Sequence, residues 1–124
     1  MSPIARFGAV SLDAAEPAVL ADFYRRLLDL DVLFEADGFI ALKGPVVMLT
    51  VQKVDDHQPP AWPSGGVPKQ LHLELAVDDL DRAEAEAVAL GAVKADVQPS
   101  PESWRVLIDP AGHPFCITTL IPDA

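Results

Sequence analysis

The chain has 124 residues, a length that fits one domain or two small modules sharing one core. Half of the residues are hydrophobic, which argues against an intrinsically disordered chain. Nine basic residues against 19 acidic ones give a net charge of −10. This acidity argues against binding to nucleic acid or to an anionic membrane surface, because both partners need clustered Lys and Arg.

The single cysteine, Cys116, excludes an internal disulfide and fits a reducing compartment. The N-terminal segment lacks the basic patch and apolar stretch of a signal peptide. No apolar run approaches the ~20 residues that a membrane span needs. We therefore expect a soluble, cytoplasmic protein with no membrane partner.

The first half of the chain predicts one helix and four strands in the order β-α-β-β-β. Alternating residues predict a strand at 6–12, and Pro17 then fits the first turn of a helix, where its missing N–H costs nothing. Apolar residues recur at helical spacing on one face of this helix, namely Leu20, Phe23, Tyr24, Leu27 and Leu28. Turn residues separate three further strands, expected at 31–35, 39–43 and 46–54.

The second half repeats this order after a linker. Residues 55–69 hold four prolines and two glycines, so they predict irregular structure between two modules, at 4–54 and 70–121 of one domain spanning 1–124. A helix is expected at 80–90, ended by Gly91. The expected strands are 70–77, 93–97, 104–109 and 115–120.

An internal repeat supports the two modules. A shift of 63 positions places Val10 on Leu73 and Leu12 on Leu75, and it also places Glu16 on Asp79. The sharpest difference between the halves is His72 in the second, where the first has Ala9. Two helices among many strands favour an α+β fold over a doubly wound sheet, which would need strands and helices in continuous alternation.

Three segments carry a resemblance to a known family. They are residues 72–80, the Phe23-Tyr24 pair, and residues 104–117 with the turn Asp109-Pro110-Ala111-Gly112-His113. Together they resemble the vicinal oxygen chelate superfamily, which includes glyoxalase I, extradiol dioxygenases and bleomycin-resistance proteins, and within it the small bacterial glyoxalase-like proteins. The resemblance covers nearly the whole chain. It implies two βαβββ modules that form a curled mixed sheet around a cavity.

The resemblance also implies where a divalent metal would bind. The four family positions, on the first and last strand of each module, fall on Ala9, Gln52, His72 and Cys116. Ala9 has no ligand atom, and Cys116 stands where the family usually has Glu, so we favour no metal and no other cofactor. If a metal is present, we expect Gln52, His72 and Cys116 to hold a soft ion such as zinc.

Other residues widen the candidate ligand-binding site beyond the family positions. Glu74 shares a strand face with His72 and is the candidate catalytic base, through a raised pKa, or a ligand anchor. Trp62 and Trp104 are candidates for a flat cavity wall. Each has a structural alternative: Trp104 belongs to the core, and Trp62 pins the linker or covers the cavity.

The same alternatives apply to the polar candidates. His72 contacts a ligand, binds a metal or is purely structural. If Cys116 has no function, it is a small buried residue. If Gln52 has no function, it is a surface position at a strand edge.

Three hypotheses about function follow. The favoured one is a metal-free protein that sequesters an aromatic or cationic compound such as an antibiotic, with His72, Glu74 and Gln52 as anchors. The alternative is a metal-dependent lyase, isomerase or dioxygenase, so whether the protein is an enzyme stays open. The third is a scaffold domain whose cavity is filled by side chains. From the resemblance alone we also expect a homodimer.

Overall fold

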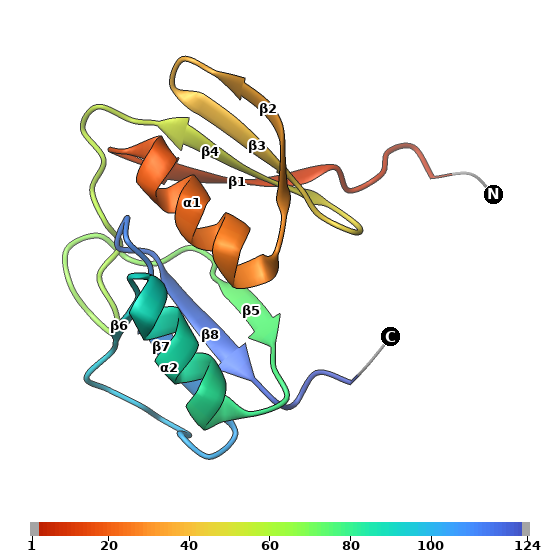
Figure 1. The fold of residues 1–124 in the computed structure, drawn as a ribbon. Coiled ribbons are helices and arrows are strands. Elements are labelled where there is room, and N and C mark those ends of the chain that lie inside the picture. Colours follow the sequence, from red (N-terminus) through yellow and green to blue (C-terminus); the bar gives the residue numbers. More distant parts are fainter. Residues whose placement is uncertain (1–2, 123–124) are drawn as a thin grey trace. The chain divides into compact units, whose positions relative to one another are not determined.

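The computed structural model describes residues 3–122, and two compact units meet between His57 and Gln58. This break falls inside the segment that the sequence predicts to be a linker. Each unit has the order β-α-β-β-β and one helix that contacts its own sheet (Figure 1). The α+β class and the repeated module are therefore as predicted. Hydrogen bonds join the strands into two four-stranded sheets, one in each unit.

The first unit contains one helix and a mixed sheet. Its elements are β1 (Ala9–Ala14), α1 (Pro17–Leu28), β2 (Asp31–Ala36), β3 (Phe39–Lys43) and β4 (Met48–Lys53). The sheet order is β1-β4-β3-β2, with β1 parallel to β4 and the other pairs antiparallel. The predicted apolar face of α1 is confirmed by its buried residues Leu20, Phe23 and Tyr24. The strand expected at 6–12 lies at 9–14, because these are the residues that find partners on β4.

The second unit repeats the arrangement. Its elements are β5 (Leu73–Ala76), α2 (Leu80–Leu90), β6 (Val93–Lys94), β7 (Trp104–Ile108) and β8 (Pro114–Thr118). The sheet order is β5-β8-β7-β6, with β5 parallel to β8. All five residues of β8 are buried, as expected for a strand with neighbours on both sides. Neither helix between residues 3 and 122 combines the length and hydropathy that a membrane crossing requires.

The two helices begin at positions related by the predicted shift. The N-cap residues are Glu16 and Asp79, which are 63 positions apart. The Asp79 side chain accepts a hydrogen bond from the backbone N–H of Arg82 at 3.1 Å, whereas Glu16 makes no such bond. Pro17 opens α1 as predicted. The repeat is therefore real in the fold, although only the second helix uses its acid as a cap.

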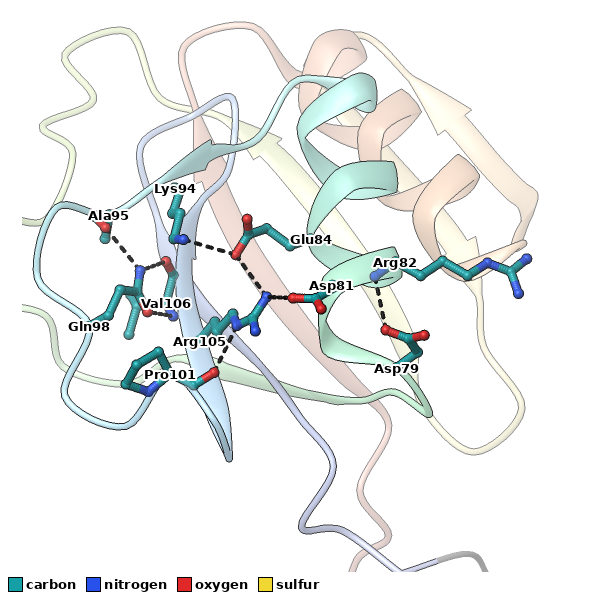
Figure 2. Close-up of polar contacts among 10 residues, drawn as sticks. All are labelled: Asp79, Asp81, Arg82, Glu84, Lys94, Ala95, Gln98, Pro101, Arg105 and Val106. Carbon is teal, nitrogen blue, oxygen red and sulfur yellow. Dashed lines mark hydrogen bonds and ion pairs between the residues drawn. The ribbon is translucent and has the colours of Figure 1, made fainter.

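The strand predicted at 93–97 is wrong in length, because only Val93 and Lys94 pair with β7. The side chain of Gln98 takes over the next positions on the edge of β7 (Figure 2). Its Nε2 donates to the carbonyl of Val106 at 2.8 Å and to that of Ala95 at 2.9 Å, and its Oε1 accepts from the N–H of Val106 at 2.9 Å. The N–H of Ala95 still donates to the carbonyl of Val106 at 3.1 Å, but the N–H of Val106 donates to Gln98 and not to the carbonyl of Ala95. One side-chain amide therefore ends the strand.

The turn between β7 and β8 is built around one buried acid. Asp109 is 3% exposed, and its Oδ1 accepts hydrogen bonds from the backbone N–H groups of Ala111 and His113, each at 3.0 Å. Gly112 has a φ of +90°, which a side chain disfavours, and a Cβ there would lie 2.5 Å from Pro59. The turn therefore needs both residues, and Gly112 also allows close approach of the segment that carries Pro59.

The face of β7 that contacts α2 carries a charged residue. The Arg105 guanidinium lies 2.8 Å from Asp81 and 3.3 Å from Glu84 on α2, and its Nε donates to the carbonyl of Pro101 at 2.8 Å (Figure 2). Lys94 lies 3.4 Å from the same Glu84. The hydrogen bond to Asp81 raises the pKa of the Arg105 guanidinium above its ordinary value. These ion pairs connect α2 to the sheet on one face, so the other face is left for a ligand.

Candidate ligand-binding site

The second unit holds a pocket of about 480 Å³ on the sheet face that carries Trp104 and Cys116. Side chains alternate along a strand, so β7 contributes Trp104 and Val106 while Arg105 faces α2. Trp62 and Lys69 come from the linker segment that precedes β5. The full lining is Trp62, Lys69, His72, Glu74, Trp104, Val106, Pro114, Cys116, Thr118, Leu120 and Ile121. A cavity of this size accepts a small molecule.

A chain of hydrogen bonds crosses the polar side of this pocket. Lys69 Nζ lies 3.0 Å from Nδ1 of His72, and Nε2 of His72 lies 2.6 Å from Oε1 of Glu74. An ammonium group only donates, so Nδ1 must accept and the imidazole proton lies on Nε2. Nε2–H then donates to the Glu74 carboxylate. The arrangement fixes one neutral tautomer of His72 between a cation and an anion.

Cys116 lies beside Glu74, its partner in the register of β5 and β8. The residue is 5% exposed, and its thiol has a pKa raised from 9.0 to about 11. Burial is the largest cause, the negative charge of Glu74 adds to it, and the positive charge of Lys69 opposes it. The thiol is therefore neutral at physiological pH and lines the pocket as a small apolar group.

His72, Glu74 and Cys116 form the one group of potential metal ligands found among residues 3–122. One donor atom from each lies within 4.8 Å of the others, and imidazole, carboxylate and thiolate are all zinc ligands. The donor set therefore fits a divalent ion in chemical type and spacing. Binding through Nε2 would require the His72 proton to move to Nδ1, which would break the hydrogen bond from Lys69.

The strand register relates the two units differently from the predicted match of Gln52 with Cys116. On the first strands the shift of 63 relates Glu74 to Ser11, and Ser11 pairs with Thr50. Glu74 pairs with Cys116, so Thr50 is the counterpart of Cys116 and the shift between the last strands is 66. The predicted match of Gln52 with Cys116 would need a shift of 64, which differs from this pairing by two residues. Such a difference preserves the face of the strand but changes the position along it.

Gln52 is exposed, as its structural alternative predicts, although β4 is an inner strand of its sheet and not an edge. It pairs with Asp13 across β1 and β4, and its Nε2 donates to Asp13 Oδ1 at 2.7 Å in the first unit. Its counterpart by register is Thr118. Ala9 pairs with Met48 and offers no ligand atom. The first-unit counterparts of His72 and Cys116 are thus Ala9 and Thr50, neither of which is a customary metal ligand.

Five of the six predicted site residues line one pocket, namely Trp62, His72, Glu74, Trp104 and Cys116. Sequence reasoning missed Lys69. One signal marks it: Lys69 is the single Lys or Arg between Lys53 and Arg82, and it precedes His72 by three residues.

The sequence matches the family described as glyoxalase-like domain over residues 9–118. The chain belongs to the glyoxalase-like family. The matched range includes all the strands and both helices, so the resemblance seen in the sequence is confirmed for the whole fold. No curated protein matches this glyoxalase-like protein.

Solved structures share the fold at low sequence identity. A glyoxalase/bleomycin resistance protein/dioxygenase family enzyme from Burkholderia phytofirmans PsJN has 16% identity and a TM-score of 0.74, covering 94% of this chain and 100% of its own. A glyoxalase family protein from Enterococcus faecalis has 18% identity and a TM-score of 0.69, with 93% and 98% covered. Lactoylglutathione lyase from Agrobacterium tumefaciens has 21% identity and a TM-score of 0.63, with 95% of each chain covered. At these identities the likeness shows the fold alone.

Proposed function

We propose that this glyoxalase-like protein binds a small aromatic molecule in the pocket of its second unit and that binding requires no metal. The observation that carries the proposal is the pocket lining. Both tryptophans of the chain lie there beside a polar chain of Lys69, His72 and Glu74. Aromatic side chains give a large apolar contact area, and a few polar groups then orient the ligand.

The charges in the pocket support binding without a metal. Lys69 supplies a positive charge next to His72, and its hydrogen bond holds the Nδ1 lone pair of the imidazole. The first-unit counterparts of His72 and Cys116, Ala9 and Thr50, bring no imidazole, carboxylate or thiolate. The side-chain ammonium of Lys69 thus provides the positive charge that a metal would bring beside His72.

The proposed outcome of binding is sequestration, as in a resistance-type protein. The Cys116 thiol has a pKa of about 11, so it is a poor nucleophile at neutral pH. The Oε1 atom of Glu74 already accepts a hydrogen bond from Nε2–H of His72. Both observations favour retention of an unchanged ligand over its chemical conversion.

Intrinsic fluorescence gives a direct test, because the chain's two tryptophans both line the pocket. A panel of small aromatic compounds that do not absorb at the tryptophan excitation wavelength is titrated into chelator-treated protein. We expect saturable quenching by some members and a matching rise in melting temperature. Aliphatic compounds of equal volume are the control. A panel that changes neither signal would contradict the proposal.

A metal-dependent lyase, isomerase or dioxygenase is the second candidate, favoured by the cluster of His72, Glu74 and Cys116. A divalent ion bound there would supply Lewis-acid polarisation of substrate oxygens. These three residues would hold it, and Lys69 would release His72. Elemental analysis of the untagged protein decides between the candidates: one equivalent of metal per chain, lost in His72→Ala, would replace the first proposal with the second.

A further inference from the structure

We propose that the pocket of the second unit selects aromatic ligands that carry an anionic group such as a carboxylate, and that Lys69 binds this group. The inference rests on the proposed function, since it names the charge of the ligand that the pocket takes. It departs from the cationic ligand that the acidity of the whole chain suggests. The local arrangement of donors decides the matter, because charge–charge interactions beyond about 10 Å are largely screened at physiological ionic strength.

Lys69 is a lysine with no carboxylate partner. Within residues 3–122, its ammonium makes one hydrogen bond, to the neutral imidazole of His72, and no carboxylate lies within 4.0 Å. By contrast, Lys53 lies 3.7 Å from Asp55 and Lys94 lies 3.4 Å from Glu84. An ammonium group has three donors, so two remain for a ligand.

The position of Lys69 favours hydrogen bonds from these two donors to an anionic ligand. The residue is part-buried at the wall of the pocket, where a ligand would displace water. A charge that loses water without gaining a counter-ion is destabilised. A ligand carboxylate would provide both the counter-ion and the acceptors, and the hydrogen bonds would be charge-assisted.

The pocket offers further donors and few acceptors. The indole N–H groups of Trp62 and Trp104 have no acceptor among the described residues, although both side chains are part-buried in the lining. Two acceptor atoms of the lining already have donors: Oε1 of Glu74 accepts from His72, and Oγ1 of Thr118 accepts from the N–H of Leu120 while donating to a carbonyl. A ligand rich in acceptors therefore complements this wall best.

Glu74 is the one opposing charge in the lining, and it defines the polarity of the pocket. Its carboxylate lies next to Cys116 on the neighbouring strand, whereas Lys69 lies on the far side of the His72 ring. The negative and positive groups thus flank one imidazole. We infer that the ligand's acidic group binds at the Lys69 end, with its ring towards the apolar residues Val106 and Pro114.

Three matched probes test the charge preference: 3-phenylpropanoate, 3-phenylpropan-1-ol and 3-phenylpropan-1-amine. Each is titrated into the chelator-treated protein by tryptophan fluorescence, with calorimetry as a second measurement. We expect the carboxylate to bind at least tenfold more tightly than the alcohol or the amine. Added salt should weaken the binding of the carboxylate alone, because it screens the charge of Lys69.

Variants separate Lys69 from the net charge of the chain. We expect Lys69→Met to lower the affinity for the carboxylate to that for the alcohol, and Lys69→Arg to keep the preference for the carboxylate. Lys43 is an exposed lysine of the first unit, so Lys43→Met should change none of the three affinities. Binding of none of the three probes overturns the proposed function and this inference together. Equal affinities, tightest binding of the amine, or a carboxylate preference that survives in Lys69→Met overturns the anion preference alone.

Discussion

Lys69 Nζ lies 3.0 Å from Nδ1 of His72, and this contact determines whether a ring nitrogen of the imidazole can accept a bond from a ligand or bind a metal. With Nδ1 accepting from Lys69 and Nε2–H donating to Glu74, neither ring nitrogen has a free lone pair. A metal would have to displace the Lys69 contact or move the ring proton. Lys69 therefore competes with any divalent ion for Nδ1 of His72.

Removing the charge of Glu74 should make Cys116 more reactive. The carboxylate helps raise the pKa of this thiol to about 11, so Glu74→Gln should lower that pKa and increase the thiolate fraction at any pH below it. Lys69→Met should act in the opposite direction, because Lys69 lowers the same pKa. Alkylation by iodoacetamide, followed by mass spectrometry, reports on this site alone because the chain has one cysteine.

The wild-type alkylation rate should rise about tenfold per pH unit through neutral and mildly alkaline pH, since the thiol has a pKa of about 11. A rate that levels off near pH 8 would contradict a buried, neutral thiol.

Gln98→Leu should destabilise the second unit. The variant leaves the backbone N–H and carbonyl of Val106 without their side-chain partner and also loses the bond to Ala95. We expect a loss of about 1–3 kcal/mol in the free energy of unfolding, because part-buried backbone groups lose hydrogen bonds. Urea denaturation measures it. The exposed Gln70→Leu is the matched control and should change little; equal effects of the two variants would refute the role of Gln98.

Gly112→Ala should destabilise the turn before β8. The new Cβ would lie 2.5 Å from Pro59, and the φ of +90° is one that alanine disfavours. We expect a cost of roughly 1–3 kcal/mol from strain of this kind, measured by thermal and urea unfolding. Gly66→Ala is the control, since a Cβ there meets nothing within 4 Å. A neutral Gly112→Ala would show that the turn does not need its glycine.

Arg105→Met should weaken the attachment of α2 to the sheet. The Arg105 side chain is 16% exposed, and its loss leaves Glu84, which is 22% exposed, with Lys94 as its remaining ion-pair partner (Figure 2). We expect about 1–2 kcal/mol of destabilisation, more than for the fully solvated pairs of exposed side chains. Arg82→Met removes an equally charged side chain that is 77% exposed, and it should have a smaller effect in the same unfolding measurement.

Local patterns in the sequence were sufficient for the elements of the fold. The apolar spacing of Leu20, Phe23 and Tyr24 predicts the buried face of α1, and the shift from Glu16 to Asp79 predicts where both helices begin. Helical periodicity, caps and turn residues act over a few positions, so one sequence reveals them. Strand alternation likewise placed His72 and Glu74 on one face, the family resemblance added Cys116, and all three line the pocket.

Strand register and long-range partners were decided by the tertiary structure alone. Alternation has a period of two, so it assigns Gln52 and Thr50 to the same face and cannot tell which of them matches Cys116. The hydrogen bonds of Gln98 to Val106 and of Lys69 to His72 depend on how irregular segments fold back on the sheet. No periodicity encodes such contacts. The sequence alone therefore determines the family, the repeat and five pocket residues, and pairing in three dimensions determines the register and the role of Lys69.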